Sequence, residues 1–192
     1  MKQKEIIDLF KKTEVIQNGH FELSSGRHTD TYLQCAKIMQ YPEYTNKLAK
    51  EISKFWEKEK IDLVVGPAIG GIIISYAVAS VMNIRNVFSE RKDGKMKFRR
   101  NLDVRENEKV LIVEDVVTTG GSVREVIDLL EESKADIIGI SSLVDRSNGQ
   151  VEFDYSFKPL LKLNVESFSA DNCKLCQKNI PRTKPGSKKI NS

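Results

Sequence analysis

The chain alternates short apolar stretches typical of buried strands with longer stretches of helical length, and this alternation restricts the possible folds most. The apolar runs at 62–65, 109–113 and 137–144 are short and rich in β-branched residues. Stretches of helical length lie between them, at 70–82 and 122–132. Strands separated by helices form βαβ units, so the sequence predicts an α/β fold with a mainly parallel central sheet flanked by helices.

Further elements are expected from periodicity and turn residues. Proline is favoured in the first turn of a helix, and Pro42 precedes apolar residues at helical spacing, so a helix should begin there. The polar, basic stretch 91–105 is expected to form a mobile loop or an exposed hairpin. The other expected elements are a helix within 1–13 and short strands at 21–24, 32–38 and 86–89.

Composition and charge limit the classes of protein that fit. A chain of 192 residues usually makes one domain, and a net charge of +4 does not by itself indicate nucleic-acid binding. No apolar run approaches the ~18–20 residues that span a bilayer, and the N-terminus lacks the apolar region of a signal peptide. Three cysteines are too few for a disulfide framework. We therefore expect a cytoplasmic protein that binds neither membrane nor nucleic acid.

The most informative segment is 110–122, where an apolar strand ends in the adjacent acids Glu114 and Asp115. A turn of small residues follows, and Ser122 and Glu125 match a capping box, which predicts that a helix begins at Ser122. Backbone N–H groups at a helix N-terminus favour an anion, and the two carboxylates could accept hydrogen bonds from a sugar diol. The segment therefore predicts a site for a ribose 5-phosphate, with a phosphate loop formed by Thr118, Thr119, Gly120, Gly121 and Ser122.

Other nucleotide-binding patterns are absent. A strand that ends in acids resembles a Walker B segment, but the chain has no G-x-x-x-x-G-K-[ST] and no G-x-G-x-x-G. Segment 110–122 instead resembles the phosphoribosyl pyrophosphate (PRPP) signature of the type I phosphoribosyltransferases. By this resemblance, the loop at 66–71 binds pyrophosphate. The residues that would bind PRPP are Glu114, Asp115, Val116, Val117, Thr118, Thr119, Gly120, Gly121, Ser122, Gly70 and Gly71.

Two segments resemble the orotate phosphoribosyltransferases within that family. Residues 21–28 are similar to their "SGR" region, and Arg146 at the end of a strand resembles their orotate-binding arginine. An arginine fork suits the carboxylate of orotate, although Arg146 could instead form an ion pair with Asp145. The orotate-binding residues that this resemblance implies are Thr118, Arg146, Ser25, Gly26 and Arg27.

Residues 89–96 resemble the mobile catalytic loop of the family, which often acts on the partner subunit of a homodimer. The loop lacks a histidine, and Ile69-Gly70 stand where some relatives carry a lysine, so we favour Arg91, Lys92 and Lys95 as the cations that meet pyrophosphate. The catalytic set is these three residues with Glu114 and Asp115. The resemblance also implies Mg²⁺ as cofactor, bound mainly through PRPP rather than by protein ligands.

The resemblance covers nearly the whole chain as a single domain. Residues 1–40 and roughly 150–180 would form a hood over the base, followed by a basic tail at 181–192. Cys173 and Cys176 form a lone C-x-x-C, which lacks a second pair for a zinc site unless two subunits pool their pairs or Cys35 contributes. His20 and His28 are expected to be structural or peripheral rather than catalytic. Two alternatives remain open: a purine phosphoribosyltransferase and a PRPP-sensing regulator.

Overall fold

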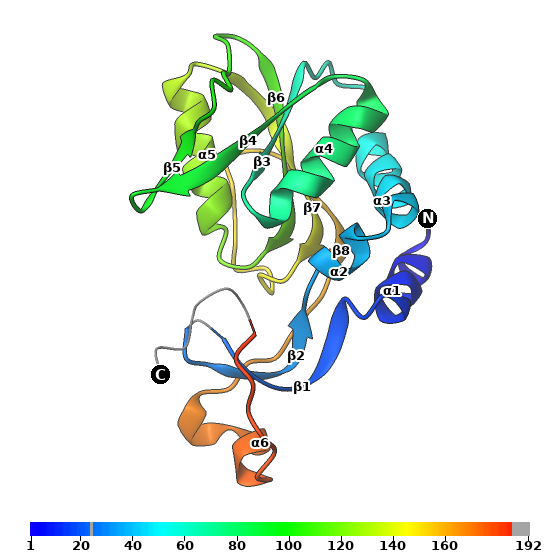
Figure 1. Cartoon of the computed structure of the whole chain (residues 1–192), viewed down its shortest axis with the longest axis vertical. Coiled ribbons are helices and arrows are strands. Elements are labelled where there is room, and N and C mark those ends of the chain that lie inside the picture. The colour runs from blue at the N-terminus through cyan, green and yellow to red at the C-terminus, as the bar shows by residue number, and fades with distance from the viewer. Residues whose placement is uncertain (24, 186–192) are drawn as a thin grey trace.

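The computed structural model describes residues 1–23 and 25–185 and contains a six-stranded sheet as its centre (Figure 1). The strand order is β5-β4-β3-β6-β7-β8, and every neighbouring pair is parallel except β4 and β5. This confirms the mainly parallel sheet expected from the alternating pattern. The strands are β3 (Leu63–Pro67), β4 (Arg85–Lys92), β5 (Lys95–Phe98), β6 (Lys109–Val117), β7 (Asp136–Asp145) and β8 (Phe157–Lys162).

Helices cover both faces of this sheet, as Figure 1 shows. Helices α1 (Gln3–Lys12), α3 (Pro42–Lys54) and α4 (Gly70–Met82) pack on one face, and α5 (Gly121–Glu132) packs on the other. Successive residues of a strand point to opposite faces, so Val64 joins the first core and Val65 the second. The first core includes Leu48, Ile52, Ile74 and Val78, and the second includes Ile112, Val123, Val126 and Leu130.

A small second sheet joins the N-terminal and C-terminal parts of the chain. Strands β1 (Ile16–Glu22) and β2 (His28–Leu33) form an antiparallel hairpin. The chain reaches this hairpin again after β8, where the 3-10 helix η1 (Ala170–Asn172) and the short helix α6 (Lys174–Gln177) lie beside it (Figure 1). Backbone hydrogen bonds connect His28 with Phe168 at 2.8 and 2.7 Å. The segments expected to form the hood therefore do lie together.

Two expectations about local structure are wrong, and one strand of the structure has no counterpart among the expected elements. The expected strand at 32–38 ends at Leu33, and its second half belongs to helix α2 (Ala36–Met39). Helix α5 begins at Gly121 and has no capping box: its N-cap is Gly120 in a left-handed conformation, with no side-chain cap bond. Strand β8 was not expected at all. The stretch 91–105, in contrast, contains the exposed hairpin that its composition predicts, formed by β4 and β5.

Two expected features extend beyond the described residues. The predicted strand at 21–24 includes Ser24, and the basic tail at 181–192 is described only as far as Pro185. In the described part of the chain, no helix is both long and apolar enough to cross a membrane.

Candidate active site at the carboxyl ends of the parallel strands

The acid pair stands at the carboxyl end of the central strand β6, where neighbouring side chains point to opposite sides. The Glu114 side chain is buried and lines a small pocket at the start of α5. Asp115 lines a larger cavity of about 710 Å³ between the ends of β3, β4 and β6. One strand thus delivers a carboxylate to each of two adjoining spaces.

Two glycines at the start of α4 leave room for these carboxylates. A Cβ atom on Gly70 would overlap the Asp115 carboxylate, and a Cβ atom on Gly71 would lie 3.1 Å from Glu114 Oε1. Both glycines belong to the predicted pyrophosphate loop at 66–71, in which the Ala68–Ile69 peptide bond is cis. The loop and the acid pair therefore form one continuous surface.

Burial controls the protonation of the inner acid. Removal from water raises the pKa of Glu114 well above its usual range, and the nearby charge of Asp115 raises it further. The backbone N–H of Asp115 donates to Glu114 Oε1 at 2.9 Å, and that of Val116 donates to Asp115 Oδ1 at 2.8 Å. These bonds fix both carboxylates close to the main chain of β6.

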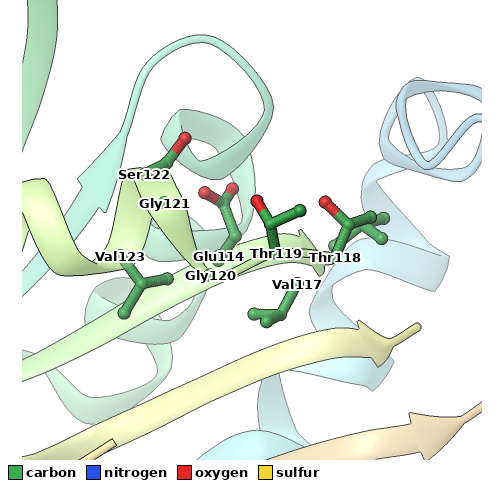
Figure 2. A pocket seen from close by; sticks show the side chains of 9 residues that line it. Glu114, Val117, Thr118, Thr119, Gly120, Gly121, Ser122 and Val123 are labelled. Atoms are coloured by element: carbon green, nitrogen blue, oxygen red, sulfur yellow. The ribbon is translucent and has the colours of Figure 1, made fainter. Parts of the chain in front are cut away.

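The turn after β6 forms a polar pocket of about 50 Å³ at the N-terminus of α5. Figure 2 shows the Glu114 carboxylate between the hydroxyl groups of Ser122 and Thr119. Gly120 is left-handed, with φ +75°, and a Cβ atom there would lie 2.9 Å from Val151 Cγ1, so only glycine fits this turn. The pocket is lined by Val123 and by all the predicted residues of 114–122 except Asp115. Free N–H groups at a helix start favour a phosphate in such a pocket.

The larger cavity is lined mainly by the predicted loops 66–71 and 89–96, and two further residues come from the N-terminal part of the chain. Besides Asp115, Gly70 and Arg91, it is lined by Gln34, Ala36, Ala68, Ile69 and Glu90. Gln34 lies in the segment that connects β2 to α2, and Ala36 is the first residue of α2. Their contribution depends on how the N-terminal hairpin docks on the sheet, for which the sequence carries no local signal.

Arg146 follows β7, the strand beside β6, and its backbone N–H donates to Val117 O at 2.8 Å. Its guanidinium is partly buried, which lowers its pKa, and among the described residues it has no hydrogen bond or ion pair. Asp145 instead accepts a hydrogen bond from the backbone of Ser147 at 2.9 Å, so the alternative ion pair between Asp145 and Arg146 is not formed. Burial raises the pKa of the nearby Tyr32 hydroxyl, while the charge of Arg146 lowers it and that of Asp115 raises it. A partly buried, unpaired arginine is suited to bind an anionic ligand.

The predicted catalytic cations lie on the β4–β5 hairpin, and only one of them lines the cavity of Asp115. Arg91 reaches this cavity, while its guanidinium donates to Glu125 Oε1 at 2.7 Å and to Gly94 O at 2.8 Å. Lys92 and Lys95 are paired across the hairpin and exposed. Neither lysine lines the cavities that hold the acid pair.

The predicted base-binding turn lies at the tip of the β1–β2 hairpin. The Gly26 N–H donates to Leu23 O at 2.9 Å, and Gly26 has φ +76°, as a tight turn requires. Arg27 Nε donates to Ser167 Oγ at 2.9 Å, and its Nη2 donates to the carbonyl of the same residue. In this structure Arg27 therefore ties the turn to the segment after β8, and none of Ser25, Gly26 and Arg27 lines the cavity of Asp115.

Comparisons with known proteins agree with this geometry. Residues 36–172 match the model of the phosphoribosyl transferase domain family. The orotate phosphoribosyltransferase of Thermoanaerobacter sp. (strain X514) is 50% identical, over 99% of this chain and 100% of that protein. That of Thermotoga maritima is 46% identical, over 95% of this chain and 98% of that protein.

Solved structures share the fold at low sequence identity. The orotate phosphoribosyltransferase of Mycobacterium tuberculosis H37Rv, in complex with inorganic phosphate, has a TM-score of 0.67 at 18% identity and covers 84% of this chain and 95% of that one. UMP synthase of Leishmania donovani has a TM-score of 0.73 at 22% identity, over 85% of this chain and 37% of that one. The family model and the full-length relatives show that this chain belongs to the phosphoribosyl transferase family and, within it, to the orotate phosphoribosyltransferases.

Proposed function

We propose that this chain transfers the ribose 5-phosphate of PRPP to orotate, which yields orotidine 5′-monophosphate and pyrophosphate for pyrimidine nucleotide synthesis. The observation that carries the proposal is the shared position of three features at one edge of the sheet. An acid pair with one buried member lies near the end of β6, a polar pocket follows it at a helix start, and Arg146 follows the neighbouring strand β7. Ligands of parallel α/β sheets bind at this edge.

In this proposal the loop at the start of α5 holds the 5′-phosphate of PRPP. The hydroxyl groups of Thr118, Thr119 and Ser122 and the backbone of Gly120 and Gly121 supply its donors. The adjoining cavity then receives the ribose, whose vicinal hydroxyls donate to Glu114 and Asp115. Gly70 and Gly71 border the leaving pyrophosphate, because they face the same carboxylates.

Orotate is assigned to the side of the cavity nearer Arg146. A guanidinium that has no partner within residues 1–23 and 25–185 offers two parallel donors to the carboxylate of the base. Thr118 and the turn Ser25–Arg27 are assigned to the same substrate. The turn must then approach the site when ligand binds, because Arg27 is bonded to Ser167 in this structure.

Catalysis is assigned to positioning and electrostatics rather than to a covalent intermediate. As the bond at the anomeric carbon breaks, positive charge develops on the sugar and negative charge on pyrophosphate. Asp115 lies beside the developing cation, and Arg91, Lys92 and Lys95 neutralise the leaving group when the hairpin closes and excludes water. Since neither Lys92 nor Lys95 lines the two cavities that hold the acid pair, we propose that they act on the partner site of a homodimer.

The same proposal includes Mg²⁺ and a cytoplasmic location. Carboxylate oxygens are ligands that suit Mg²⁺, and the Asp115 side chain lines the large cavity. When bound with PRPP, the ion would neutralise charge on the pyrophosphate. The protein residues near it would be Glu114 and Asp115. All three cysteines are free thiols, as is usual in a reducing compartment.

A base-selectivity assay tests the proposed function. The purified chain is incubated with PRPP and Mg²⁺ and, in parallel, with orotate, hypoxanthine, adenine or uracil, and pyrophosphate release is measured. We expect pyrophosphate release only in the reaction that contains orotate as the base. Reaction with a purine would keep the PRPP assignments and overturn the role of Arg146. Binding of PRPP without reaction of any base would instead support a PRPP-sensing regulator.

A further inference from the structure

The hood contains a cluster of four metal-ligating side chains outside the candidate active site. His20 and His28 come from the β1–β2 hairpin, and Cys173 and Cys176 come from the start of α6 (Figure 1). One ligand atom from each of the four residues lies within 4.8 Å of the other three. We propose that these residues form a structural zinc site that joins the two ends of the chain.

The distances within the cluster fit a single tetrahedral ion. His20 Nε2 lies 3.0 Å from His28 Nδ1 and 3.6 and 3.8 Å from the sulfurs of Cys173 and Cys176, and Cys176 Sγ lies 3.4 Å from His28 Nδ1. Zn–N bonds of about 2.0 Å and Zn–S bonds of about 2.3 Å in a tetrahedron separate ligand atoms by about 3.3–3.8 Å. The three distances to sulfur lie in this range, and the two histidine nitrogens would have to move apart by about 0.3 Å. The four side chains thus converge on one point, and Cys₂His₂ is a common ligand set of structural zinc.

The hydrogen bonding of His20 prepares one nitrogen for a metal. Its Nδ1 lies 2.8 Å from the carbonyl oxygen of Ile180, which can only accept a hydrogen bond, so Nδ1 carries the proton. The lone pair of a neutral ring is then on Nε2, the atom that faces the other three ligands. An N–H···O=C bond on the far nitrogen is the usual support of a zinc-bound histidine.

The C-terminal segment has few buried side chains, so a bound ion would stabilise its fold. Between Lys162 and Pro185, Cys173 is the only buried residue, so this segment has no hydrophobic core of its own. His20 and His28, which face this segment, are only 3% and 1% exposed. Small modules without a core are often held together by a metal. The zinc site would therefore fix the C-terminal segment on the N-terminal hairpin.

The cluster needs neither a second subunit nor Cys35. Cys35 is not a member of the cluster. Burial raises the pKa of its thiol, and the charges of the acid pair Asp115 and Glu114 raise it further. The two histidines supply within one chain the ligands that the lone C-x-x-C lacks. The site is thus complete in a monomer, and its stoichiometry is one ion per chain.

The experiment measures metal binding directly. The full chain is purified under reducing conditions without chelator, and its zinc is determined by elemental analysis. We expect about one zinc per chain, a lower melting temperature after chelation, and recovery with Zn²⁺ but not with Mg²⁺. Replacement by Co²⁺ should give the absorption of a tetrahedral ion with thiolate charge-transfer bands.

Matched variants locate the ion. Cys176→Ser and His28→Gln should each lose most of the zinc and the cobalt spectrum, whereas Cys35→Ser should keep both. If a ligand variant does not fold, the cobalt spectrum of the unmodified chain still decides the question. The proposal is overturned if the reduced chain binds neither Zn²⁺ nor Co²⁺, if Cys35→Ser loses the ion as well, or if intact mass shows a stable Cys173–Cys176 disulfide in the purified chain.

Discussion

The carboxylate of Asp115 lies in the space that a side chain on Gly70 would occupy. A methyl group there would have to displace the Asp115 carboxyl group and its hydrogen bond from the Val116 N–H. This loss of about 1 kcal/mol is partly offset by the higher helix propensity of alanine. The same displacement would move the carboxylate assigned to the ribose, and shifts near 1 Å can cost about 10²-fold in rate. A substitution that disturbs the Gly70–Asp115 contact should therefore lower activity much more than stability.

Gly70→Ala should lower kcat/KM for PRPP by about 10- to 100-fold while it changes the free energy of unfolding by less than about 1 kcal/mol. Steady-state kinetics and thermal melts of the same preparations measure the two effects. Ser80→Ala, at an exposed position of the same helix, is the control and should leave both unchanged. A Gly70→Ala enzyme with normal kinetics would show that Asp115 does not need its observed position.

Burial of Glu114 should make its ionised form a cost to stability. Because burial raises its pKa, the folded chain holds this proton more tightly than the unfolded chain, whose value is about 4.3. The ionised carboxylate therefore destabilises the fold above the folded pKa, and this cost disappears as the pH falls through the folded value towards the unfolded one.

Glu114→Gln should accordingly melt higher than the unmodified chain near pH 7–8, by about 2–4 °C for each kcal/mol recovered. The difference in melting temperature should shrink as the pH is lowered towards about 5. Thermal melts across this pH range measure it. A variant that melts lower at neutral pH, or a difference that does not depend on pH, would contradict the buried-acid assignment.

Arg146 should determine the affinity for orotate. Arg146→Lys keeps the charge but loses the planar fork, so KM for orotate should rise by about 10-fold or more while KM for PRPP stays within about twofold. Initial rates with each substrate varied in turn separate the two constants. Arg105→Lys, at an exposed position before β6, is the control. Equal increases in both KM values would indicate a general structural effect instead.

The hairpin lysines should act across a dimer. Lys95→Ala and Asp115→Asn chains are each expected to have little activity, but a mixed dimer would contain one site with both native residues. After subunit exchange at equal amounts, random pairing predicts recovery of about a quarter of the normal activity. Two batches of Asp115→Asn mixed in the same way provide the background. No recovery, although exchange is demonstrated, would place the lysines in their own chain's site or outside catalysis.

The sequence predicts well those parts of the site that lie close together along the chain. Strand β6, the acid pair and the loop before α5 are continuous, and helix α4 occupies its predicted range of 70–82. Local signals fail where tertiary contacts intervene. The capping box at Ser122 and Glu125 is not formed because left-handed Gly120 starts the helix and Glu125 pairs with Arg91.

Two further features could not be predicted for the same reason. Strand β8 contains Pro159, which is unfavourable within a sheet but tolerated at its edge, and β8 is the edge strand. The cluster of His20 with Cys173 joins residues 153 positions apart. The two histidines of the β1–β2 hairpin and the C-x-x-C at 173–176 come together only when α6 docks on the hairpin. Neither part of the cluster can therefore be predicted from the other.

The turnover of Asp115→Asn with PRPP and orotate tests the account most directly. The substitution keeps the shape of the side chain and removes the charge that is assigned to the ribose hydroxyls and the developing cation. We predict a loss of kcat on the order of 10²-fold or more, with a melting temperature within a few degrees of the unmodified chain. A folded Asp115→Asn enzyme that converts orotate at the normal rate would contradict the assignment of the acid pair, and with it the proposed mechanism.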